Sequence, residues 1–538
     1  TNEQVVPRRS SRRISGSSTS HISLDYNVKH WERDMTSVVR EDGTTVDEDD
    51  QQAQQERFFN DRINDGSDLT VEDAVNLNDG KWIKDDSVQL AHAFIKDLSS
   101  TETKSSAPSP SKNETATPNG RASRTRTQVP SPDSVLSFGG YSNKKQPPVN
   151  DEAISKMVDD LSIDNEEWVA KVTPERIYSV AAHPGSSKLI AAAGDKQGYV
   201  GLWDVDGKVS SISSNSSGGA RGEHEDMKKK SNPGVSLFHV HSRPICCLDW
   251  LSNDTMVTAS YDGSVRRLHA ERGIFEEIFA TYDSDSTYSE DLGFDLDQGR
   301  GYWTQSVIPD PRYGLGGENS NPCLFVTTSH GQVFHLDLRV SGKEKITFHE
   351  SLSAKKINSV SLHPNGTTLA SGGLDGVVRL FDIRKFGDDR GHSKWTSPKP
   401  FCTQHTGLSI SSSFFSPTGQ YLLTTSFANR LDLLEDAHVK KGTNKPTHSI
   451  RHNNQTGRWL TTFQATWHPS LDIFCCGSMN QPRCMEVFDG KHGKLLRAVT
   501  GESLTSVMSR TCFHPTTKEL IMIGGNSSGR VVAVRKNV

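Results

Sequence analysis

The chain has 538 residues, of which 33% are apolar and 24% are charged, and its formal net charge is −5. Even with its 43 glycines added, the apolar share stays below the roughly 45–50% of an average globular protein, which indicates that part of the chain does not fold. No run of about 18 apolar residues occurs, which excludes a membrane-spanning helix in this sequence. The first 20 residues are rich in Ser and Arg rather than apolar, so we expect a soluble intracellular protein.

Charge is distributed unevenly along the chain. Residues 1–170 hold 20 Lys and Arg against 30 Asp and Glu, a net charge of −10. Residues 171–350 hold 18 against 24, a net charge of −6, and residues 351–538 hold 23 against 12, a net charge of +11. A mildly acidic protein therefore contains a distinctly basic C-terminal part.

Residues 1–170 are predicted to be a mostly disordered acidic tail. Up to residue 150, Ser, Thr, Asp, Asn, Gln and charged residues dominate, and such a composition cannot bury enough apolar surface to offset chain entropy. Two patches, Phe58-Phe59 and residues 88–98, have helical apolar spacing and either fold on a partner or form transient helix without function. Basic clusters in the tail fit nuclear import or phosphate contact, with a solvated basic tail as the alternative. They contain Arg8, Arg9, Arg12, Arg13, Arg121, Arg124 and Arg126.

From residue 177 onward one pattern recurs seven times. A short apolar strand and a turn, often His-Pro, precede a strand of small and branched residues, a second turn, and a third strand that ends near an aromatic-Asp pair. Turns such as Asp262-Gly263 and Asp375-Gly376 favour hairpins because glycine adopts a positive φ without steric cost. The units begin near residues 177, 245, 323, 357, 410, 463 and 506.

This pattern resembles the WD-repeat family, whose four-stranded blades close into a propeller. Trp203-Asp204 matches the signature that ends such a repeat, and Phe381-Asp382 and Phe488-Asp489 are degenerate forms of it. We therefore predict an all-β fold, a seven-bladed WD-repeat β-propeller over residues 171–538. Closure of the ring protects strand edges that would otherwise aggregate. The resemblance also implies that two histidines shortly before first strands are buried and structural. They are His241 and His405.

Motifs of catalysis and metal binding do not indicate an enzyme. The string Gly525-Asn526-Ser527-Ser528-Gly529 matches the G-x-S-x-G pattern of hydrolases, but that motif needs a strand-to-helix turn, and here it falls in a predicted hairpin. No phosphate-binding loop, dinucleotide fingerprint or zinc-protease motif occurs. The eight cysteines show no Cys-x-x-Cys spacing, so we interpret them as reduced, small apolar residues. We predict a binding module that uses no cofactor and no metal.

Longer strings carry a closer resemblance. ERIYSVAAHP at 175–184, KKINSVSLHPNGTTLASGGLDGVVRLFDIR at 355–384 and HNNQTGRW at 452–459 look like the damaged-DNA-binding subgroup of WD-repeat propellers. Within it they are similar to the family of WD repeat-containing protein 76 and the fungal changed-mutation-rate protein. The resemblance implies binding of duplex DNA, preferably damaged or modified, in the nucleus, as part of the DNA-damage response together with chromatin proteins. The net charge of +11 in the same part of the chain agrees, because Lys and Arg that neutralise phosphates supply most sequence-independent affinity.

The resemblance also implies a set of DNA-binding residues. Two lysines precede a first strand, where the related damage-binding propeller contacts the DNA backbone. A second group of residues lies in the connection between units five and six, where that relative inserts a hairpin at a lesion. There an aromatic wedge stacks on bases while an arginine holds phosphate. Trp459 as a rim residue packed on its own blade, and the lysines as a solvated pair, are the alternatives. The set is Lys355, Lys356, Arg451, His452, Gln455, Arg458 and Trp459. Three arginines on third strands, Arg266, Arg267 and Arg379, are interpreted as structural.

A second surface is indicated by Asp337-Leu338-Arg339 and Asp382-Ile383-Arg384, which end two successive units. They are similar to the D-x-R core by which propeller substrate receptors dock on the damaged-DNA-binding adaptor of cullin-4 ubiquitin ligases, and arginine offers a rigid charged fork for interface ion pairs. The alternative is that each arginine pairs with the aspartate of its own blade. The competing class of function is a protein-interaction scaffold in chromatin or protein quality control, without direct DNA contact.

Overall fold

The computed structural model describes residues 63, 66–76, 87–100, 151–163, 166–207, 234–281, 302–313, 323–387, 398–515 and 519–536. The chain divides into two compact units, Thr1–Phe58 and Phe59–Val538, and all the described residues belong to the second. The predicted basic clusters and the Phe58-Phe59 patch lie outside the described residues.

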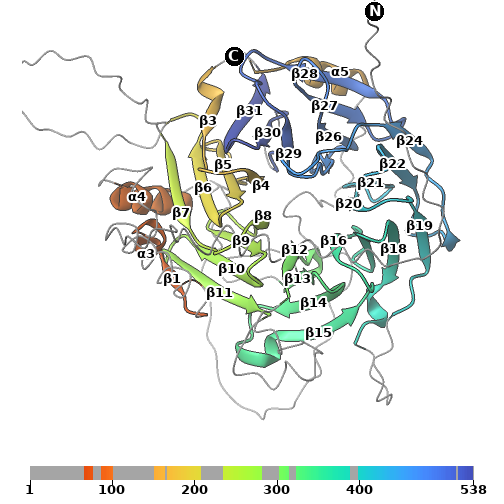
Figure 1. Ribbon diagram of the computed structural model, residues 1–538, viewed down its shortest axis with the longest axis horizontal. Coiled ribbons are helices and arrows are strands. Elements are labelled where there is room, and N and C mark those ends of the chain that lie inside the picture. The colour runs from red at the N-terminus through yellow and green to blue at the C-terminus, as the bar shows by residue number, and fades with distance from the viewer. Residues whose placement is uncertain are drawn as a thin grey trace, which may run out of the picture. The chain divides into compact units, whose positions relative to one another are not determined.

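Seven sheets of antiparallel strands surround a central axis (Figure 1). The first three blades are β4 (Ile177–Ala182) to β7, β8 (Ile245–Trp250) to β11, and β12 (Thr304–Pro309) to β15. The next are β16 (Ile357–Leu362) to β19, β20 (Ile410–Phe415) to β24, β25 (Thr466–Trp467) to β28, and the three strands that begin with β29 (Met508–Phe513). The first strands of neighbouring blades contact one another around the axis. The prediction of a seven-bladed propeller is confirmed.

The remaining strands complete these blades in chain order. They are β5 (Ile190–Asp195), β6 (Tyr199–Asp204), β7 (Val235–His239), β9 (Thr255–Ser260), β10 (Ser264–His269), β11 (Ile274–Ala280), β13 (Cys323–Thr328), β14 (Gln332–Asp337), β15 (Ile346–Ser351), β17 (Thr368–Gly373), β18 (Val377–Asp382), β19 (Cys402–His405), β21 (Tyr421–Ser426), β22 (Arg430–Glu435), β24 (His448–Arg451), β26 (Ile473–Gly477), β27 (Cys484–Asp489), β28 (Leu495–Thr500), β30 (Met522–Asn526) and β31 (Arg530–Lys536). A short β23 (Gly442–Thr443) adds in parallel to β19. The predicted hairpin turns are confirmed, since Gly263 and Gly376 have φ of 93° and 73°.

The ring is closed by a strand from the N-terminal side of the propeller. β3 (Val169–Lys171) pairs antiparallel with β31, from Val169 opposite Val532 to Lys171 opposite Arg530, and β2 (Leu161–Ser162) pairs with the end of the same strand. The last blade therefore takes its outer strands from the start of the folded region, so hydrogen bonds between distant parts of the sequence close the ring.

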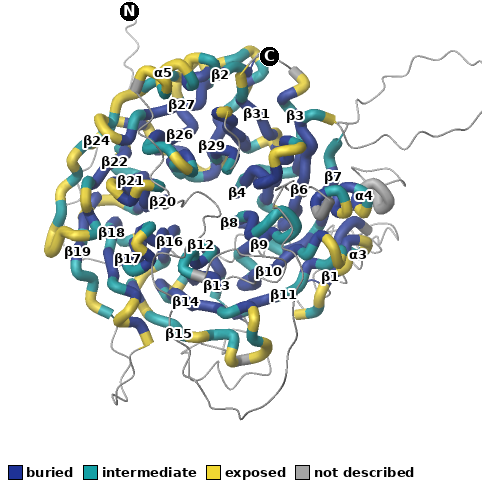
Figure 2. Tube along the Cα trace, turned by 180° about the vertical axis from the view of Figure 1, so that it is seen from behind, coloured by how far each residue is buried: buried dark blue, intermediate teal, exposed yellow. Residues whose placement is uncertain are grey.

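Burial follows the position of a strand within its blade. The second strands β5, β17 and β21 are buried along their whole length, because neighbouring blades cover both of their faces. Outer strands such as β24 and β28 alternate with exposed positions, and Figure 2 shows this change from dark blue near the axis to yellow at the rim. Small residues such as the alanines of β5 allow the blades to approach closely.

Several segments before residue 171 fold against the propeller, where the sequence predicts a mostly disordered tail. β1 (Leu69–Thr70) pairs with β11, and α3 (Val71–Asn76) and α4 (Ser87–Ser100) pack beside β7. Phe94 of α4 shares an apolar cluster with Phe238 and Phe275 of the first two blades. A third helix, α5 (Asp151–Asp159), contacts β28. Among the described residues, no helix is long and apolar enough to cross a membrane.

Arg266 anchors part of this N-terminal segment to the second blade. Its side chain is fully buried and donates hydrogen bonds to the carbonyl oxygens of Ile63, at 2.7 Å, and Ser67, at 3.0 Å, while Glu277 lies 3.4 Å away. The structural role predicted for the third-strand arginines is confirmed, since Arg267 pairs with Glu276 and Arg379 with Asp375.

Candidate nucleic-acid interface

The two predicted surfaces lie at opposite ends of the ring. In every blade the chain enters the innermost strand at one end, and because the strands are antiparallel, the turn between the second and third strands returns to that end. We call this end the upper face and the other end the lower face. Lys355-Lys356 precede β16 and residues 451–459 precede β25, on the upper face, whereas Asp337 to Arg339 and Asp382 to Arg384 follow third strands, on the lower face.

The lysine pair lies on a segment that is held tightly against the preceding blade. A Cβ at Gly331, which has a φ of 75°, would lie 2.0 Å from the carbonyl oxygen of Ser353 and 2.7 Å from that of Lys355, so the turn before β14 packs directly on this segment. Lys355 is exposed, whereas Lys356 is partly buried, with its ammonium 5.7 Å from the ring centroid of Tyr261. The two lysines are therefore not equivalent.

The connection between blades five and six is anchored on both sides of an exposed apex. The side-chain amide of Gln455 donates to the carbonyl oxygen of Phe427 at 2.6 Å, and the hydroxyl of Thr461 donates to the carbonyl oxygen of Ile177. Between them, the carbonyl oxygen of Arg458 accepts from Arg176 at 2.6 Å. Trp459 is 84% exposed, so its ring does not pack on its own blade. The segments on either side of Trp459 are therefore held in place, while its indole ring is exposed.

His452 stands apart from the other predicted DNA-binding residues, because it is only 5% exposed. Its backbone N–H donates to Asn429, as that of His241 does to Gly198 at the equivalent place in another blade. Its ring nitrogens lie 2.6 Å from Asn454 Oδ1 and 3.4 Å from Glu486 Oε2. This environment is that of a structural histidine and argues against a DNA contact.

The predicted structural histidines differ in their surroundings. His241 is buried, with Nδ1 2.9 Å from Asp262 and Nε2 2.8 Å from the Thr258 hydroxyl, so its prediction is confirmed. The prediction for His405 is wrong, because that residue is exposed at the end of β19. Thr406 takes the buried position instead, and its N–H donates to Gly376. In this blade the buried position therefore lies one residue later in the sequence than His405.

A central cluster, which the sequence did not single out, joins the predicted residues. Arg176 binds the carbonyl oxygen of Arg458 and donates to the Tyr178 hydroxyl at 2.7 Å, with its guanidinium 5.0 Å from that ring. Tyr178 meets Tyr261 edge to face at 6.2 Å, and Tyr261 lies near Lys356 and stacks on Trp303 at 5.2 Å. The central cluster is Arg176, Tyr178, Tyr261, Trp303 and Lys356.

The cluster places Lys356 and the backbone of Arg458 beside one group of aromatic rings, although the two residues come from different blades. The location of these residues relative to the predicted strands could have identified the cluster. Each member lies just before or at the start of a first strand, or in the turn between second and third strands. All such positions lie on the upper face.

The predicted DNA-binding cations and the predicted docking arginines differ in their ion pairs. Within the described part of the chain, no carboxylate forms an ion pair with Arg176, Lys355, Lys356, Arg451 or Arg458. On the lower face, Arg339 lies 2.7 Å from Asp337 and Arg384 lies 2.7 Å from Asp382, the pairing that the sequence left as the alternative to docking. These hydrogen bonds lower the pKa of both aspartates, yet the arginines stay 54% and 68% exposed.

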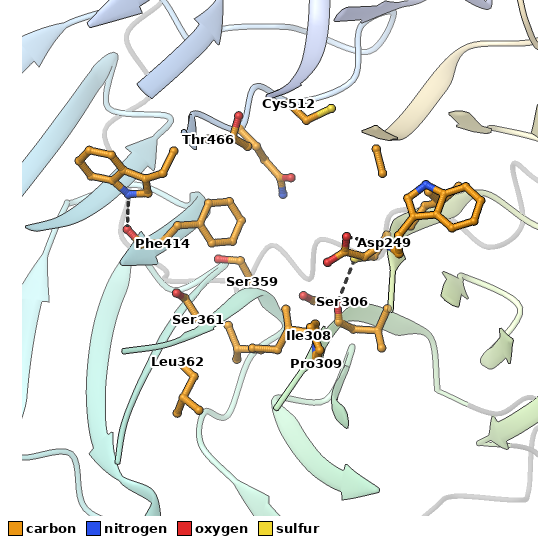
Figure 3. A pocket seen from close by; sticks show the side chains of 18 of the residues that line it. Asp249, Ser306, Ile308, Pro309, Ser359, Ser361, Leu362, Phe414, Thr466 and Cys512 are labelled. Atoms are coloured by element: carbon orange, nitrogen blue, oxygen red, sulfur yellow. Dashed lines mark hydrogen bonds between the residues drawn. The ribbon is translucent and has the colours of Figure 1, made fainter. Parts of the chain in front are cut away.

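A cavity of about 360 Å³ runs along the axis of the ring (Figure 3). Every first strand contributes to its lining, with Val180, Asp249, Ile308, Val360, Phe414, Thr466 and Cys512. Burial raises the pKa of Asp249 to about 6, and its carboxylate accepts the backbone N–H of Trp250 at 2.8 Å. No group of three His, Cys, Asp or Glu side chains that could hold a metal occurs among the described residues. The G-x-S-x-G string forms the turn between β30 and β31, not a strand-to-helix elbow.

The chain is similar in sequence to known WD-repeat proteins. The family model described as WD domain, G-beta repeat, matches residues 234–266 and 342–382. WD repeat-containing protein 76 of Xenopus laevis is 32% identical over 395 residues, 72% of this chain and 58% of that protein. The DNA damage-binding protein cmr1 of Aspergillus terreus is 30% identical over 420 residues, 71% of either chain. The chain belongs to this family of WD-repeat proteins.

Other members of the family match a similar stretch. The DNA damage-binding protein CMR1 of Chaetomium globosum is 30% identical over 381 residues, 67% of this chain and 64% of that protein. The chain thus spans less than two thirds of the frog and Chaetomium relatives. The fold and the names of these relatives favour a non-catalytic, DNA-damage-related protein.

Proposed function

We propose that this chain is a nuclear, non-enzymatic DNA-binding protein of the DNA-damage response, and that its upper face binds duplex DNA with a preference for damaged or modified sites. The observation that carries the proposal is the gathering of unpaired cations around an aromatic cluster on that face. Cations without carboxylate partners are available to neutralise phosphates and release counterions, which supplies most of the sequence-independent affinity for DNA. The names of the fungal relatives, DNA damage-binding proteins, support the same function.

Preference for damage is assigned to the apex of the connection between blades five and six. Trp459 projects from a segment held on both sides, so little conformational entropy is lost when its ring enters a duplex. Inserting an aromatic wedge costs the unstacking of a base step, and that cost is lowest where a lesion already weakens stacking. Arg458, the preceding residue, holds a flanking phosphate.

The test compares lesion-bearing and plain duplexes at fixed salt. Trp459→Ala with Arg458→Ala is expected to weaken binding of the lesion-bearing duplex more than that of the plain one, because base stacking on an aromatic ring contributes about 1–3 kcal/mol. Lys494→Ala with Leu495→Ala is the matched control, since it removes an exposed cation and an exposed apolar side chain from the lower face. Equal losses on both duplexes would contradict the wedge.

The lower face favours a second role as substrate receptor of a cullin-4 ubiquitin ligase. Two Asp–Arg pairs of the same geometry stand on adjacent blades, with guanidinium groups preorganised by their own aspartates and open to solvent. A preorganised fork loses less entropy when it binds a partner carboxylate.

Co-purification of the ligase adaptor tests this role. Arg339→Ala with Arg384→Ala is expected to reduce adaptor recovery, while Lys440→Ala with Lys491→Ala, two exposed lysines of the same face, is not. Undiminished recovery with the arginine variant rules this surface out. A protein-interaction scaffold in chromatin or protein quality control becomes the better description if neither DNA nor the adaptor binds.

A further inference from the structure

Arg510 is a buried cation that forms no ion pair with any described residue. It lies in β29, the innermost strand of the last blade, and is only 7% exposed. Its Nε and Nη1 atoms are buried and have no hydrogen-bond partner among the described residues. Because an unpaired buried charge is costly, buried arginines are normally paired or hydrogen-bonded. The arrangement therefore requires an explanation.

Neutral groups surround Arg510. The ionisable groups that act most strongly on its pKa are Tyr261, Cys247, Cys246 and Tyr178, none of which is a carboxylate. Burial lowers the pKa of Arg510 and raises those of Tyr261 and Cys247, to about 12 and about 11, so these neighbours carry no charge at neutral pH.

Lys356 faces the same environment. Burial lowers its pKa, and its ionisable neighbours are Cys246 and Tyr178, which it shares with Arg510. Its ammonium forms no ion pair within the described ranges and lies over the Tyr261 ring. Arg176, on the other side of Tyr178, adds a third cation. Three cations thus surround two tyrosine rings.

These groups lie just before or near the start of first strands, at the upper-face end of the strands that line the central cavity. Arg510 precedes Cys512 by two residues, and side chains two apart in a strand point to the same side. Cys512 lines the cavity along the axis, so Arg510 lies on the side of β29 that faces the axis. The chain enters β29 at the upper face, which puts Arg510 nearer to that face than Cys512. We call Arg510, Lys356 and Arg176 the channel-mouth cations.

We propose that the channel-mouth cations form a binding site for a terminal phosphate group, carried either by the strand end of broken DNA or by a free polyphosphate. A terminal phosphate offers several charged oxygens to cations that converge from different sides, and such charge-assisted hydrogen bonds are strong. A phosphate within a continuous duplex has a sugar on either side and cannot enter a channel end first. Binding of a DNA strand end rests on the function proposed above, whereas binding of a free polyphosphate does not.

The first experiment uses the full chain and sodium tripolyphosphate at constant ionic strength. Calorimetry is expected to show saturable binding, and the melting temperature of the wild type is expected to rise, because a ligand that binds only the folded state stabilises it. Arg510→Met should weaken binding at least tenfold, and Lys356→Met should do so as a second variant if the first fails to fold. Lys491→Met, an exposed lower-face change, should leave it unaltered. Undiminished binding in both channel variants overturns the proposal.

The second experiment identifies the source of the phosphate. Nicked duplexes that differ only in a 5′-phosphate or a 5′-hydroxyl at the nick are compared. A tenfold preference for the phosphate that Arg510→Met removes assigns the site to strand ends. Tripolyphosphate binding without this preference assigns it to free polyphosphate.

The two proposals fail in different ways. If the wild type binds neither tripolyphosphate nor the phosphorylated nick preferentially, the terminal-phosphate site is refuted even where plain duplex still binds. If tripolyphosphate binds and no duplex does, the DNA-binding function fails and the anion site stands.

Discussion

Exposed upper-face cations should set the salt dependence of DNA binding. Lys355, Arg451 and Arg458 are exposed and have no ion-pair partner among the described residues, so each is available to neutralise one phosphate. Each such contact contributes about 0.9 to the slope of log K against log salt concentration for duplex DNA. Changing all three residues to Gln should therefore make the slope about 2.7 less steep.

That slope translates into a measurable ratio. Between 50 and 200 mM salt, a difference of about 2.7 in slope corresponds to about 40-fold, so the wild type should lose about 40-fold more affinity than the triple variant. Fluorescence anisotropy with a plain duplex at four or more salt concentrations measures both slopes. The effect should be the same on lesion-bearing DNA, because phosphate contacts carry no information about the base.

A matched triple variant on the lower face distinguishes the loss of phosphate contacts from the change in the net charge of the protein. Lys440, Lys491 and Lys494 are exposed and lie between third and fourth strands, on the lower face, so their change to Gln removes the same charge at the other end of the ring. We expect its slope to stay within about 0.5 of the wild type. Equal slopes in the two triple variants, or an unaltered slope in the upper-face variant, refute the assignment of DNA to the upper face.

Two further predictions concern stability. Arg266→Met should lower the free energy of unfolding by about 3–5 kcal/mol in urea denaturation, because it removes the charged hydrogen bonds to the carbonyl oxygens of Ile63 and Ser67 from a fully buried site. Arg379→Met, whose ion pair is partly exposed, should cost about 0–1 kcal/mol. Similar losses would contradict the anchoring role. Burial would raise the pKa of Asp262, but the charge of His241 and hydrogen bonds from His241 and Ser264 hold it at about 2, below its usual value of 3.8. Because the folded pKa is the lower one, Asp262 contributes about 2 kcal/mol that is present above about pH 4 and is lost as the pH falls towards 2. Denaturation of Asp262→Asn between pH 5 and 2 should show a flatter profile, and a profile parallel to the wild type would refute this.

The propeller could be predicted from sequence because its units are local. Each hairpin is specified by residues within about 30 positions, by alternating apolar residues and by turns such as Asp375-Gly376. The exposed residues Lys355, Arg458 and Trp459 could be chosen because a string around them carried the resemblance. His452 came with the same string, but its burial depends on Glu486, which lies in another strand.

Long-range contacts explain what the sequence did not reveal. α4 is amphipathic, but its apolar face is covered by Phe238 and Phe275, more than 100 residues away, so composition alone favours a disordered tail. The central cluster and Arg510 combine residues from different blades, and no single string of the sequence contains them. Pattern analysis finds periodic neighbours along the chain, whereas these sites arise only when seven first strands converge on one axis.

The separation of the two faces constrains how the proposed functions can combine. The central cluster with its cations and the exposed indole lie on the upper face, whereas both Asp–Arg pairs follow third strands on the lower face. A duplex on the upper face would leave both guanidinium groups open to a partner. Adjacent blades hold the two pairs in fixed relation, so a partner that binds both is oriented relative to the DNA by the propeller itself. A rigid ring that separates its sites in this way can hold DNA and a partner protein together without any change in its own conformation.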